Sequence, residues 1–345
     1  MSQEAKSVPE NQERYSRQTL FAPIGPEGQA RIKRARAAIV GCGAIGASVC
    51  SLLARAGIGT LRIIDRDYVE TSNVQRQILF DEDDARRSLP KADAAASKLS
   101  GINSQVKVES YVKDLTPETV PLLSGADVIL DCTDNFETRY LINDSAVKNG
   151  TAWIYAAAVG SYAVTMNVLP EETACLACIF AEPPQGTFAT CETAGILNSA
   201  ANLVASVQVT EALKLLVGAR QQLRRTLLSM DLWTNDRSEI SAATPRADCQ
   251  VCQQKIFTHL EGKARPQITL CGRNSVQIHE RERPVDFPEM SSRLSPHGEV
   301  RYNDMILKFW REAYEMTVFR DGRAIIKGTT DPAVARSLYA RFVGS

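Results

Sequence analysis

Residues 36–46 read Arg36-Ala-Ala-Ile-Val-Gly41-Cys-Gly43-Ala44-Ile-Gly46, and this stretch determines the class of fold. Its first five residues form a short apolar run that predicts a strand, and residues 44–56 have helical spacing. Glycines at such a junction permit a tight turn and let a phosphate group approach the N-terminus of the helix. The stretch therefore predicts the first βαβ unit of a nucleotide-binding sheet, although close packing of a helix on a strand would also favour these glycines.

Strand and helix patterns then alternate along residues 36–150. Strands are predicted at 61–64, 106–112 and 128–130, and helices at 91–99 and 137–148. This alternation predicts an α/β fold with a Rossmann-like, mostly parallel sheet and helices on both faces. Residues 153–169 are β-rich with Gly160 as a turn, and residues 227–233 are strand-like, so we expect an antiparallel extension of that sheet. Residues 193–217 have the apolar spacing of a long helix.

Composition divides the chain into three parts. Residues 1–13 form a polar tail that we expect to be flexible, and residues 14–262 form the main domain. The polar run EGKARPQ at 261–267 marks a boundary, after which residues 267–345 predict a small α+β domain. Its predicted elements are a strand at 267–276, a helix at 288–294, strands at 305–310 and 317–326 with Asp321-Gly322 as a hairpin turn, and a helix at 332–342.

The charge balance excludes several classes of partner. Lys plus Arg and Asp plus Glu number 40 each, so nothing in the charge indicates nucleic acid or an acidic membrane surface. Two charge-free runs, 37–54 and 193–210, approach membrane-spanning length, but glycines interrupt the first, and Asn198, Asn202 and Gln208 lie in the second. The N-terminus has no secretory signal and the count of 9 cysteines is odd, so we expect a cytoplasmic protein without a disulfide framework.

Two Cys-x-x-Cys pairs predict a metal centre. Cys175 and Cys178 form the first pair, and Cys249 and Cys252 form the second. Four thiolates in two tight pairs can close a tetrahedral zinc site with no open position for chemistry. We therefore expect structural zinc that ties two segments together. The alternatives are two unrelated pairs or a redox dithiol, which needs only one pair.

Acidic and basic residues follow the second predicted strand. Asp65 stands at its end, where an acid usually holds a ribose hydroxyl. Arg76 and Lys91 come soon after and suit the phosphates of a nucleoside triphosphate, on which charge builds as pyrophosphate leaves. Hydride transfer creates no such charge, which disfavours a nicotinamide cofactor. A surface ion pair for Arg76 and a solvated helix start for Lys91 are the simpler alternatives.

Asp131-Cys-Thr-Asp134-Asn135 ends another predicted strand, at the sheet edge where folds of this class bind ligands. Asp134 suits Mg²⁺, which usually takes one or two protein carboxylates and otherwise waters and phosphates. Both Asp134 and Asn135 also suit a helix N-cap. No general base is apparent near the glycine loop, because the three histidines lie at 259, 279 and 297. This favours a nucleophile that is already an anion, such as a carboxylate attacking the α-phosphorus of ATP.

Taken together, these motifs resemble the ThiF/MoeB/HesA family, bacterial relatives of the ubiquitin-activating enzymes. The matching residues are Arg14-Tyr-Ser-Arg17-Gln18, the glycine loop at 41–46, Asp65, Asp67, Asn73-Val-Gln75-Arg76-Gln77, Pro90-Lys91, residues 131–135, both cysteine pairs and Thr190-Cys191-Glu-Thr-Ala-Gly195. The resemblance implies adenylation, with ATP and Mg²⁺, of the C-terminal glycine of a small ubiquitin-like sulfur carrier that ends in Gly-Gly. It also implies a homodimer in which Arg17 reaches the ATP site of the other subunit.

The resemblance further implies roles for single residues. Asp65 would hold the ribose, and Asn73, Arg76 and Lys91 would contact the phosphates. Asp134 would bind magnesium, and the four cysteines of the two pairs would bind zinc. The remaining expected contacts of the nucleotide are Gly41, Gly43, Ala44, Gly46, Asp67, Ser72, Gln75 and Asn135. Ala44 departs from many relatives, which have a glycine there, and its methyl group is acceptable if φ stays negative.

Cys191 is a separate candidate for chemistry. It follows a Pro-Gly loop and is predicted to open the long apolar helix, where a thiol has a lowered pKa. The resemblance implies a covalent link through such a cysteine to the carrier or its sulfur, with a sulfur donor such as a cysteine desulfurase. The alternative for Cys191 is packing under a loop. We expect the other cysteines to be core residues, namely Cys42, Cys50, Cys132 and Cys271.

The C-terminal residues indicate a subtype. LCGRNxVQ from Leu270 and DGRxxIxGT from Asp321 resemble the extended ThiF proteins of thiazole synthesis in Bacillus-like bacteria. We interpret residues 267–345 as a docking or dimer-supporting domain. The open alternatives are MoeB-type activation of the molybdopterin carrier, activation of carboxylates in peptides or modified tRNA, an NAD-dependent oxidoreductase, and a non-catalytic binding scaffold.

Overall fold

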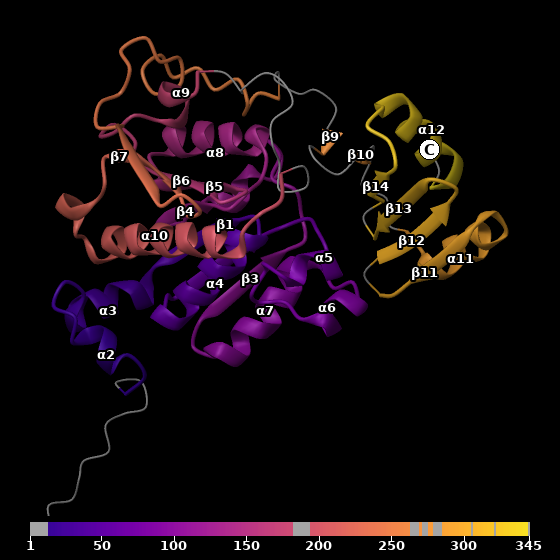
Figure 1. The fold of residues 1–345 in the computed structure, drawn as a ribbon, viewed down its shortest axis with the longest axis horizontal. Coiled ribbons are helices and arrows are strands. Elements are labelled where there is room, and N and C mark those ends of the chain that lie inside the picture. The colour runs from indigo at the N-terminus through magenta and orange to yellow at the C-terminus, as the bar shows by residue number, and fades with distance from the viewer. Residues whose placement is uncertain are drawn as a thin grey trace, which may run out of the picture.

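The computed structural model describes residues 13–181, 194–262, 269–270, 275–278, 285–304, 306–320 and 322–343. The strands form an eight-stranded sheet and, later in the chain, a six-stranded sheet (Figure 1). This confirms the predicted fold class, a Rossmann-like sheet followed by a smaller α+β unit. The bounds of the domains stay predictions, because residues 263–268 lie outside the described ranges.

The strands of the larger sheet lie in the order β3-β2-β1-β4-β5-β6-β7-β8. Parallel pairing joins β1 (Arg36–Val40), β2 (Thr60–Ile64), β3 (Lys107–Tyr111), β4 (Val128–Asp131) and β5 (Trp153–Val159). Antiparallel pairing then adds β6 (Tyr162–Val168), β7 (Thr226–Asp231) and β8 (Asp236–Ser241). The direction reverses at Gly160, whose φ of 59° suits a tight turn. The predicted antiparallel extension is confirmed.

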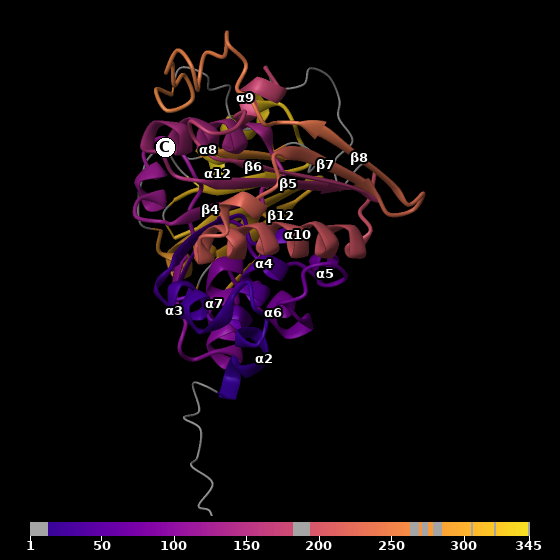
Figure 2. The same cartoon turned by 90° about the vertical axis from the view of Figure 1, so that its left-hand side faces the viewer.

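Helices cover both faces of this sheet. One face carries α3 (Gly25–Arg34), α4 (Ala44–Ala56), α7 (Lys91–Ile102) and α10 (Asn198–Val217), and the other carries α8 (Phe136–Asn149) and α9 (Leu176–Ile179). Figures 1 and 2 show α8 and α10 on opposite sides of the strands. The shorter helices are α2 (Ser16–Thr19), α5 (Thr71–Val74) and α6 (Glu82–Arg86), with 3-10 turns at Val120–Leu123 and Arg220–Gln222.

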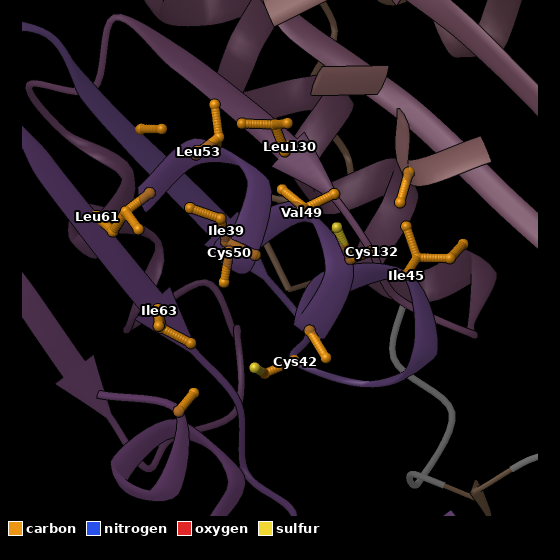
Figure 3. Close-up of a cluster of buried hydrophobic side chains, with 14 of the residues drawn as sticks. Ile39, Cys42, Ile45, Val49, Cys50, Leu53, Leu61, Ile63, Leu130 and Cys132 are labelled. Atoms are coloured by element: carbon orange, nitrogen blue, oxygen red, sulfur yellow. The ribbon is translucent and has the colours of Figure 1, made fainter. Parts of the chain in front are cut away.

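The core under α4 fixes the start of that helix over the sheet. Val49 and Leu53 of α4 pack with Ile39, Leu61 and Leu130 of the strands, and all five side chains are fully buried (Figure 3). Burying each such aliphatic side chain contributes roughly 1.5–3 kcal/mol. The same core contains the buried cysteines, as predicted for Cys42, Cys50 and Cys132, whereas Cys271 lies outside the described residues.

α10 is long and apolar enough to cross a membrane by length and composition, a test that the buried core helix of a globular protein also passes. Its Ala201 and Ala205 are buried in the core against α4. Its Gln208 is also buried and donates to the backbone oxygens of Asp131 and Ile154 at 2.9 and 2.7 Å. Buried polar side chains in protein cores are hydrogen-bonded in this way, and Gln208 here bonds to two strands of the sheet. This agrees with the prediction that the run is a core helix and does not span a membrane.

α3 and β8 are among the elements that escaped prediction, because little of either one is apolar and buried. α3 has the sequence GPEGQARIKR, in which Ile32 is the only large apolar side chain that is buried. β8 has the sequence DRSEIS, and all its residues are exposed, so no alternation of apolar and polar residues marks it. Its backbone pairing with β7 defines it as a strand.

The smaller sheet is antiparallel throughout its described strands, in the order β11-β12-β13-β14-β10-β9. Its strands are β9 (Thr269–Leu270), β10 (Ser275–Ile278), β11 (Glu299–Tyr302), β12 (Ile306–Arg311), β13 (Tyr314–Phe319) and β14 (Ala324–Lys327). The helices α11 (Phe287–Leu294) and α12 (Pro332–Phe342) pack on one face through Phe287, Phe309 and Tyr339, and a 3-10 turn spans Ser295–His297.

The predictions for this unit were partly right. α12 has the predicted bounds, and β13 and β14 form the hairpin predicted at Asp321-Gly322, with a φ of 85° at Gly322. The single strand predicted at 267–276 is wrong, because β9 and β10 are separate strands that pair with each other in antiparallel register. An apolar run alone does not reveal a reversal of this kind.

Candidate nucleotide site and four-cysteine centre

The glycines of the loop between β1 and α4 have different reasons to be there. A Cβ on Gly46 would lie 2.0 Å from the carbonyl oxygen of Gly41. A Cβ on Gly41, whose φ is 87°, would lie 2.8 Å from the carbonyl oxygen of Cys132. Packing of the loop therefore requires both glycines. At Gly43 the nearest atom to such a Cβ is Nε2 of Gln77 at 3.9 Å, so the fold itself leaves space there.

That space lies at the N-terminus of α4. Gly43 is the N-cap and has no side-chain capping bond, and Ala44 begins the helix. Ala44 is not among the residues with positive φ, so its methyl group is accommodated as predicted. A helix N-terminus carries free N–H groups and a partial positive charge, which together favour an anion such as a phosphate.

Asp65 follows β2 and turns its carboxylate toward the glycine loop. Oδ2 accepts the N–H of Cys42 at 2.5 Å, and Oδ1 accepts the N–H of Asp67 at 2.7 Å. Burial raises the pKa of Asp65, against the opposing effect of the positive charge on Lys91. The carboxylate thus fastens the glycine loop to the end of β2. Its predicted contact with a ribose stays a prediction.

Lys91 begins α7 with a side chain that is only 3% exposed. Its Nζ lies 3.1 Å from Oδ2 of Asp67. The backbone N–H of Lys91 also donates to the carbonyl oxygen of Asp67, at 2.8 Å. A lysine is rarely buried to this extent unless its charge is paired. The alternative of a solvated helix start is therefore wrong, and a buried cation stands near the glycine loop.

The residues after Asp67 form α5 and a turn. Asn73 is buried, and its Oδ1 accepts the N–H of Glu70 at 3.2 Å. Arg76 is half-buried, and its Nη1 donates to the carbonyl oxygen of Ser72 at 2.6 Å. Within the described ranges Arg76 forms no ion pair, so the structure does not support the alternative of a surface ion pair for it.

Ser72 and Gln75 are exposed. The carbonyl oxygen of Gln75 accepts the Nδ2 group of Asn198 at 3.2 Å, which links the turn to the start of α10. Gln77 is buried, and no partner of its Oε1 is found in the described part of the chain. Its Nε2 is the atom nearest to the space at Gly43. We did not predict a role for Gln77, although it ends the motif that begins at Asn73.

Asp131 and Arg139 form a buried ion pair behind the loop that follows β4. Oδ2 of Asp131 lies 3.5 Å from Nε of Arg139, and Oδ1 accepts the N–H and the hydroxyl of Thr133 at 2.9 and 2.7 Å. Burial raises the pKa of Asp131 to about 6, although the positive charge of Arg139 opposes this. Nη2 of Arg139 donates to the carbonyl oxygen of Thr133 at 2.6 Å, so the pair holds the loop.

Asp134 and Asn135 complete this loop. Asp134 is exposed. Burial opposes the charge of Arg66, but the negative charges of Asp114, Asp67 and, to a smaller extent, Asp134 outweigh it and raise the pKa of Arg66. Oδ1 of Asn135 accepts the N–H of Thr138 at 2.8 Å, so Asn135 is the N-cap of α8. Capping was one of the two interpretations of Asn135. A further contact of Asn135 with a nucleotide stays a prediction.

The topology explains why these residues share one edge. β1 pairs in parallel with β2 and with β4, so the carboxyl ends of all three strands lie side by side. The glycine loop, Asp65 and residues 131–135 each follow one of these ends. In open sheets of this class, ligands bind at this edge. The structure thus brings the N-terminus of α4, the buried cation of Lys91 and the exposed carboxylate of Asp134 to one edge of the sheet.

Arg17 and Cys191 are not joined to this group in the described chain. Arg17 is exposed on α2, which Figures 1 and 2 draw apart from α5. Cys191 lies outside the described residues. α10 begins only at Asn198, because Gly195 has a φ of 73° and Ile196 forms a parallel bridge with Gly160. The prediction that Cys191 opens the long helix is wrong, and the argument for its lowered pKa does not hold.

The four cysteines of the two predicted pairs meet in space. The Sγ atoms of Cys175 and Cys178 are 3.8 Å apart, those of Cys175 and Cys249 are 3.6 Å apart, and those of Cys178 and Cys252 are 3.4 Å apart. All four lie within 4.8 Å of one another. A tetrahedral site with Zn–S bonds of about 2.3 Å requires S···S distances of about 3.8 Å. The cluster therefore fits zinc and not a single redox dithiol.

Ionisation of these thiols is uneven, because each negative charge opposes the next. Hydrogen bonding, chiefly with Cys175, lowers the pKa of Cys178 to about 5. Burial and the neighbouring sulfurs raise the pKa of Cys252 to about 12, and the hydrogen bond with Cys178 raises the pKa of Cys175. A bound cation is what would allow four thiolates to coexist here.

α8 holds both halves of the four-cysteine centre through buried polar side chains. Oδ1 of Asn143 accepts the N–H of Leu176, between the first two cysteines, at 2.9 Å. Oδ2 of Asp144 accepts the N–H of His259, beyond the second pair, at 3.0 Å, and the His259 ring stacks on Tyr140. These anchors were not predicted. The sequence signals them only by placing the polar residues Asn143 and Asp144 side by side in α8, a helix whose residues are mostly buried.

Comparison with known proteins gives a consistent relationship. The ThiF family model matches residues 15–251. The chain is 47% identical, over 337 residues, to the sulfur carrier protein ThiS adenylyltransferase of Bacillus subtilis (strain 168), in an alignment that covers 96% of this chain and 99% of that protein. It is 37% identical over 251 residues to the sulfur carrier protein adenylyltransferase of Thermus thermophilus, covering 70% of this chain and 91% of that one.

Among solved structures, Escherichia coli MccB with ATP has a TM-score of 0.62, with 23% identity, and the match covers 72% of this chain and 75% of that chain. At this identity the likeness shows a shared fold alone.

Proposed function

Because the chain belongs to the ThiF family, we propose that it is an ATP-dependent adenylyltransferase for the C-terminal glycine of a ThiS-type, ubiquitin-like sulfur carrier that ends in Gly-Gly. The carbonyl carbon of the acyl-adenylate would then be attacked by the outer sulfur of a persulfide, AMP would leave with the electron pair of its bond to that carbon, and a thiol reductant would cleave the resulting acyl disulfide to give a carrier thiocarboxylate for thiazole synthesis. The relative from B. subtilis supports this assignment, because its name states the activity and its alignment extends over nearly the whole chain.

The observation that carries the proposal is the buried cation beside the glycine loop. Lys91 is held by Asp67 at 3.1 Å, and its charge acts on Asp65, whose carboxylate in turn holds the N–H of Cys42. A fixed positive charge next to free helix N–H groups matches a polyphosphate. Transfer of a hydride to a dinucleotide creates no phosphoryl charge that such a fixed cation would stabilise.

The reaction needs positioning more than acid–base catalysis. A carboxylate oxygen of the carrier forms a bond to the α-phosphorus of ATP. The bond from that phosphorus to the α,β-bridging oxygen breaks, and pyrophosphate leaves with the electron pair. No proton is transferred, since the nucleophile is already an anion. Stabilising the charge on five-coordinate phosphorus and on the leaving group is the work of nearby donors and cations.

We assign these roles to the residues at the carboxyl edge. Asp65 binds the ribose hydroxyls, and Asn73, Arg76 and Lys91 bind the phosphates. Gly41, Gly43, Ala44 and Gly46 present the helix N-terminus, and Asp67, Ser72, Gln75 and Asn135 complete the surroundings of the nucleotide. The exposed carboxylate of Asp134 suits Mg²⁺, which would neutralise phosphate charge when bound. The four-cysteine centre would hold zinc as a structural ion.

The rest of the assembly follows from the same proposal. The enzyme acts in the cytoplasm as a homodimer, and Arg17 of one subunit reaches the nucleotide of the other. The exposure of Arg17 on α2 is compatible with this. A cysteine desulfurase supplies sulfur, and Cys191 forms the covalent link to the carrier or its sulfur.

ATP–pyrophosphate exchange in the presence of the carrier tests the proposal. Arg76→Ala should reduce exchange about 100-fold or more, while zinc content stays unchanged. Arg86→Ala is the matched control, because Arg86 is an exposed arginine on the neighbouring helix α6. Exchange in Arg76→Ala equal to that of the wild type would reject the assignment.

The identity of the carrier needs a second measurement. ThiS-type and molybdopterin-type carriers that end in Gly-Gly would be incubated with the enzyme and MgATP and then weighed by mass spectrometry. A gain of one adenylate on the ThiS-type carrier is expected, and a gain only on the other would transfer the assignment to MoeB-type activation. NADH that stabilises the chain against heat, with no effect of ATP, would indicate an oxidoreductase. A scaffold would adenylate neither carrier.

A further inference from the structure

We propose that the smaller C-terminal sheet positions the nucleotide-binding segment of the larger unit, through Tyr68 and through an ion pair between Glu70 and Lys327. This inference rests on the proposed function, since it concerns the segment that carries Asp67, Asn73 and Lys91. Figure 1 shows the smaller sheet beside α5 and α6. Its contacts come from the face that α11 and α12 leave open.

Tyr68 is the apolar part of this contact. It comes from the loop after β2, yet it is only 2% exposed, because it packs with Ile306, Phe319 and Ile325 of the smaller sheet. Its hydroxyl lies 3.3 Å from Oγ1 of Thr317, which is fully buried on β13. A loop tyrosine with this burial is anchored by the second unit, since these apolar neighbours all belong to the second unit.

Charged groups surround the tyrosine. Nζ of Lys327 lies 2.5 Å from Oε1 of Glu70, and the Tyr68 hydroxyl donates to the same carboxylate oxygen at 3.2 Å. Nζ of Lys308 lies 4.4 Å from the centroid of the Tyr68 ring, and Glu315 lies 3.7 Å from Lys327. Half-buried charges lose hydration, so they hold one geometry when paired and strongly disfavour the geometries in which they are not.

The same segment carries the nucleotide site. The N–H of Asn73 donates to the carbonyl oxygen of Glu70 at 2.8 Å, and Oδ1 of Asn73 accepts the N–H of Glu70 in return. Tyr68 forms a β-bridge with Pro90, immediately before Lys91. Any shift of Tyr68 or Glu70 therefore moves the groups proposed to bind phosphate.

Local structure alone would not fix this segment. α5 has four residues, and an isolated helix of that length has no stability of its own in water. Asn73 is the one residue of α5 that is buried. The second unit supplies the missing support, so we infer that Tyr68, Glu70 and Lys327 are positioning residues for the nucleotide.

The test measures ATP–pyrophosphate exchange and thermal unfolding in full-length Lys327→Met, which keeps most of the side chain but removes its charge. We expect KM for ATP to rise about tenfold, which corresponds to about 1.4 kcal/mol, with a smaller change in kcat. Tyr68→Phe, which removes only a hydroxyl, should change KM in the same direction. Arg301→Met is the control, because it breaks an exposed ion pair with Glu299 in the same sheet.

A double-variant cycle separates positioning from simple attachment of the two units. If Glu70 and Lys327 act as a pair, Glu70→Gln should add little to the change in KM already caused by Lys327→Met. A role in stability alone would lower the melting temperature of Lys327→Met and leave KM for ATP as in the wild type, and that result would overturn the inference. Wild-type protein without exchange activity would instead reject the proposed function, so the two failures are distinguishable.

Discussion

Oδ2 of Asp131 lies 3.5 Å from Nε of Arg139, and both side chains are buried behind the loop that is proposed to hold the metal and nucleotide. Each charge would be costly without the other. The carboxylate also accepts two hydrogen bonds from Thr133. Even so, burial raises the pKa of Asp131 to about 6. The loop that follows β4 is thus held by a carboxyl group that becomes protonated only slightly below neutral pH.

Asp131 should make the stability of the protein depend on pH. A folded-state pKa near 6 exceeds the ordinary value near 4, so the folded chain binds this proton more tightly than the unfolded chain does. The stabilisation from Asp131 is therefore present below pH 4 and lost as pH rises through about 6. Relative to Asp131→Asn, the wild-type free energy of unfolding should fall by on the order of 2–3 kcal/mol between pH 4 and pH 7. Urea unfolding of both proteins at pH 4 and pH 7 measures their free energies of unfolding. A difference between the two proteins that is the same at both pH values would contradict the prediction.

Gly46→Ala should destabilise the glycine loop. The new Cβ would lie 2.0 Å from the carbonyl oxygen of Gly41, and no flexible side chain can move aside to relieve that contact. We expect a loss of about 1–3 kcal/mol, seen as a lower melting temperature, together with loss of exchange activity.

Gly43→Ala is the matched variant for that experiment. The nearest atom to its new Cβ is 3.9 Å away, so the methyl group has room, although the backbone at φ −82° and ψ −144° lies outside the regions that alanine favours. We therefore expect a smaller loss of stability than in Gly46→Ala. If a phosphate occupies the space beside Gly43, KM for ATP should nevertheless rise. A variant with unchanged stability and unchanged KM would place the phosphates elsewhere.

Asn135→Ala should lower the stability of α8 by about 1 kcal/mol, because its Oδ1 caps the helix through the N–H of Thr138. Asn135→Asp keeps an acceptor at the same position and should recover most of this loss. Chemical denaturation of the three proteins measures the difference. If both variants lose exchange activity while Asn135→Asp keeps its stability, Asn135 also contacts the nucleotide.

Removal of the metal should unfold the region around the four-cysteine centre. We expect one zinc per chain by elemental analysis, and a chelator should lower the melting temperature in proportion to the zinc removed. Cys249→Ser should abolish zinc binding, because Cys249 is fully buried in the cluster and the described ranges offer no fifth ligand in the group. Cys50→Ala is the control, since this core cysteine lies in α4 and should leave zinc content unchanged. Full zinc in Cys249→Ser would refute the assignment.

Much of the fold was predictable because its elements bury a clear apolar pattern. β1, α4 and α12 have the bounds that their apolar spacing predicts. The start of α10 was placed too early, because a bridge from Ile196 to Gly160 is a long-range contact that no local pattern reveals. β8 was missed because backbone pairing holds it, and α3 was missed because it buries a single large apolar side chain.

The candidate site was predictable to a lesser degree. The motifs identified Asp65, Asn73 and Lys91, and the structure brings them to one edge of the sheet. The buried polar residues that hold the loops were not identified, among them Arg139 and Asp144. In a sequence these look like the solvated face of a helix, and only the packing of α8 between the sheet and the four-cysteine centre shows that they are buried.

The separation of the cysteine pairs has a consequence for how the chain is made. Cys175 and Cys249 are 74 positions apart in sequence, although their sulfurs lie 3.6 Å apart. At a synthesis rate of about 5–20 residues per second, the second pair leaves the ribosome roughly 4–15 s after the first. During that interval the strands and helices that have already emerged must hold together without a closed metal centre, because the centre can close only after Cys252 has emerged.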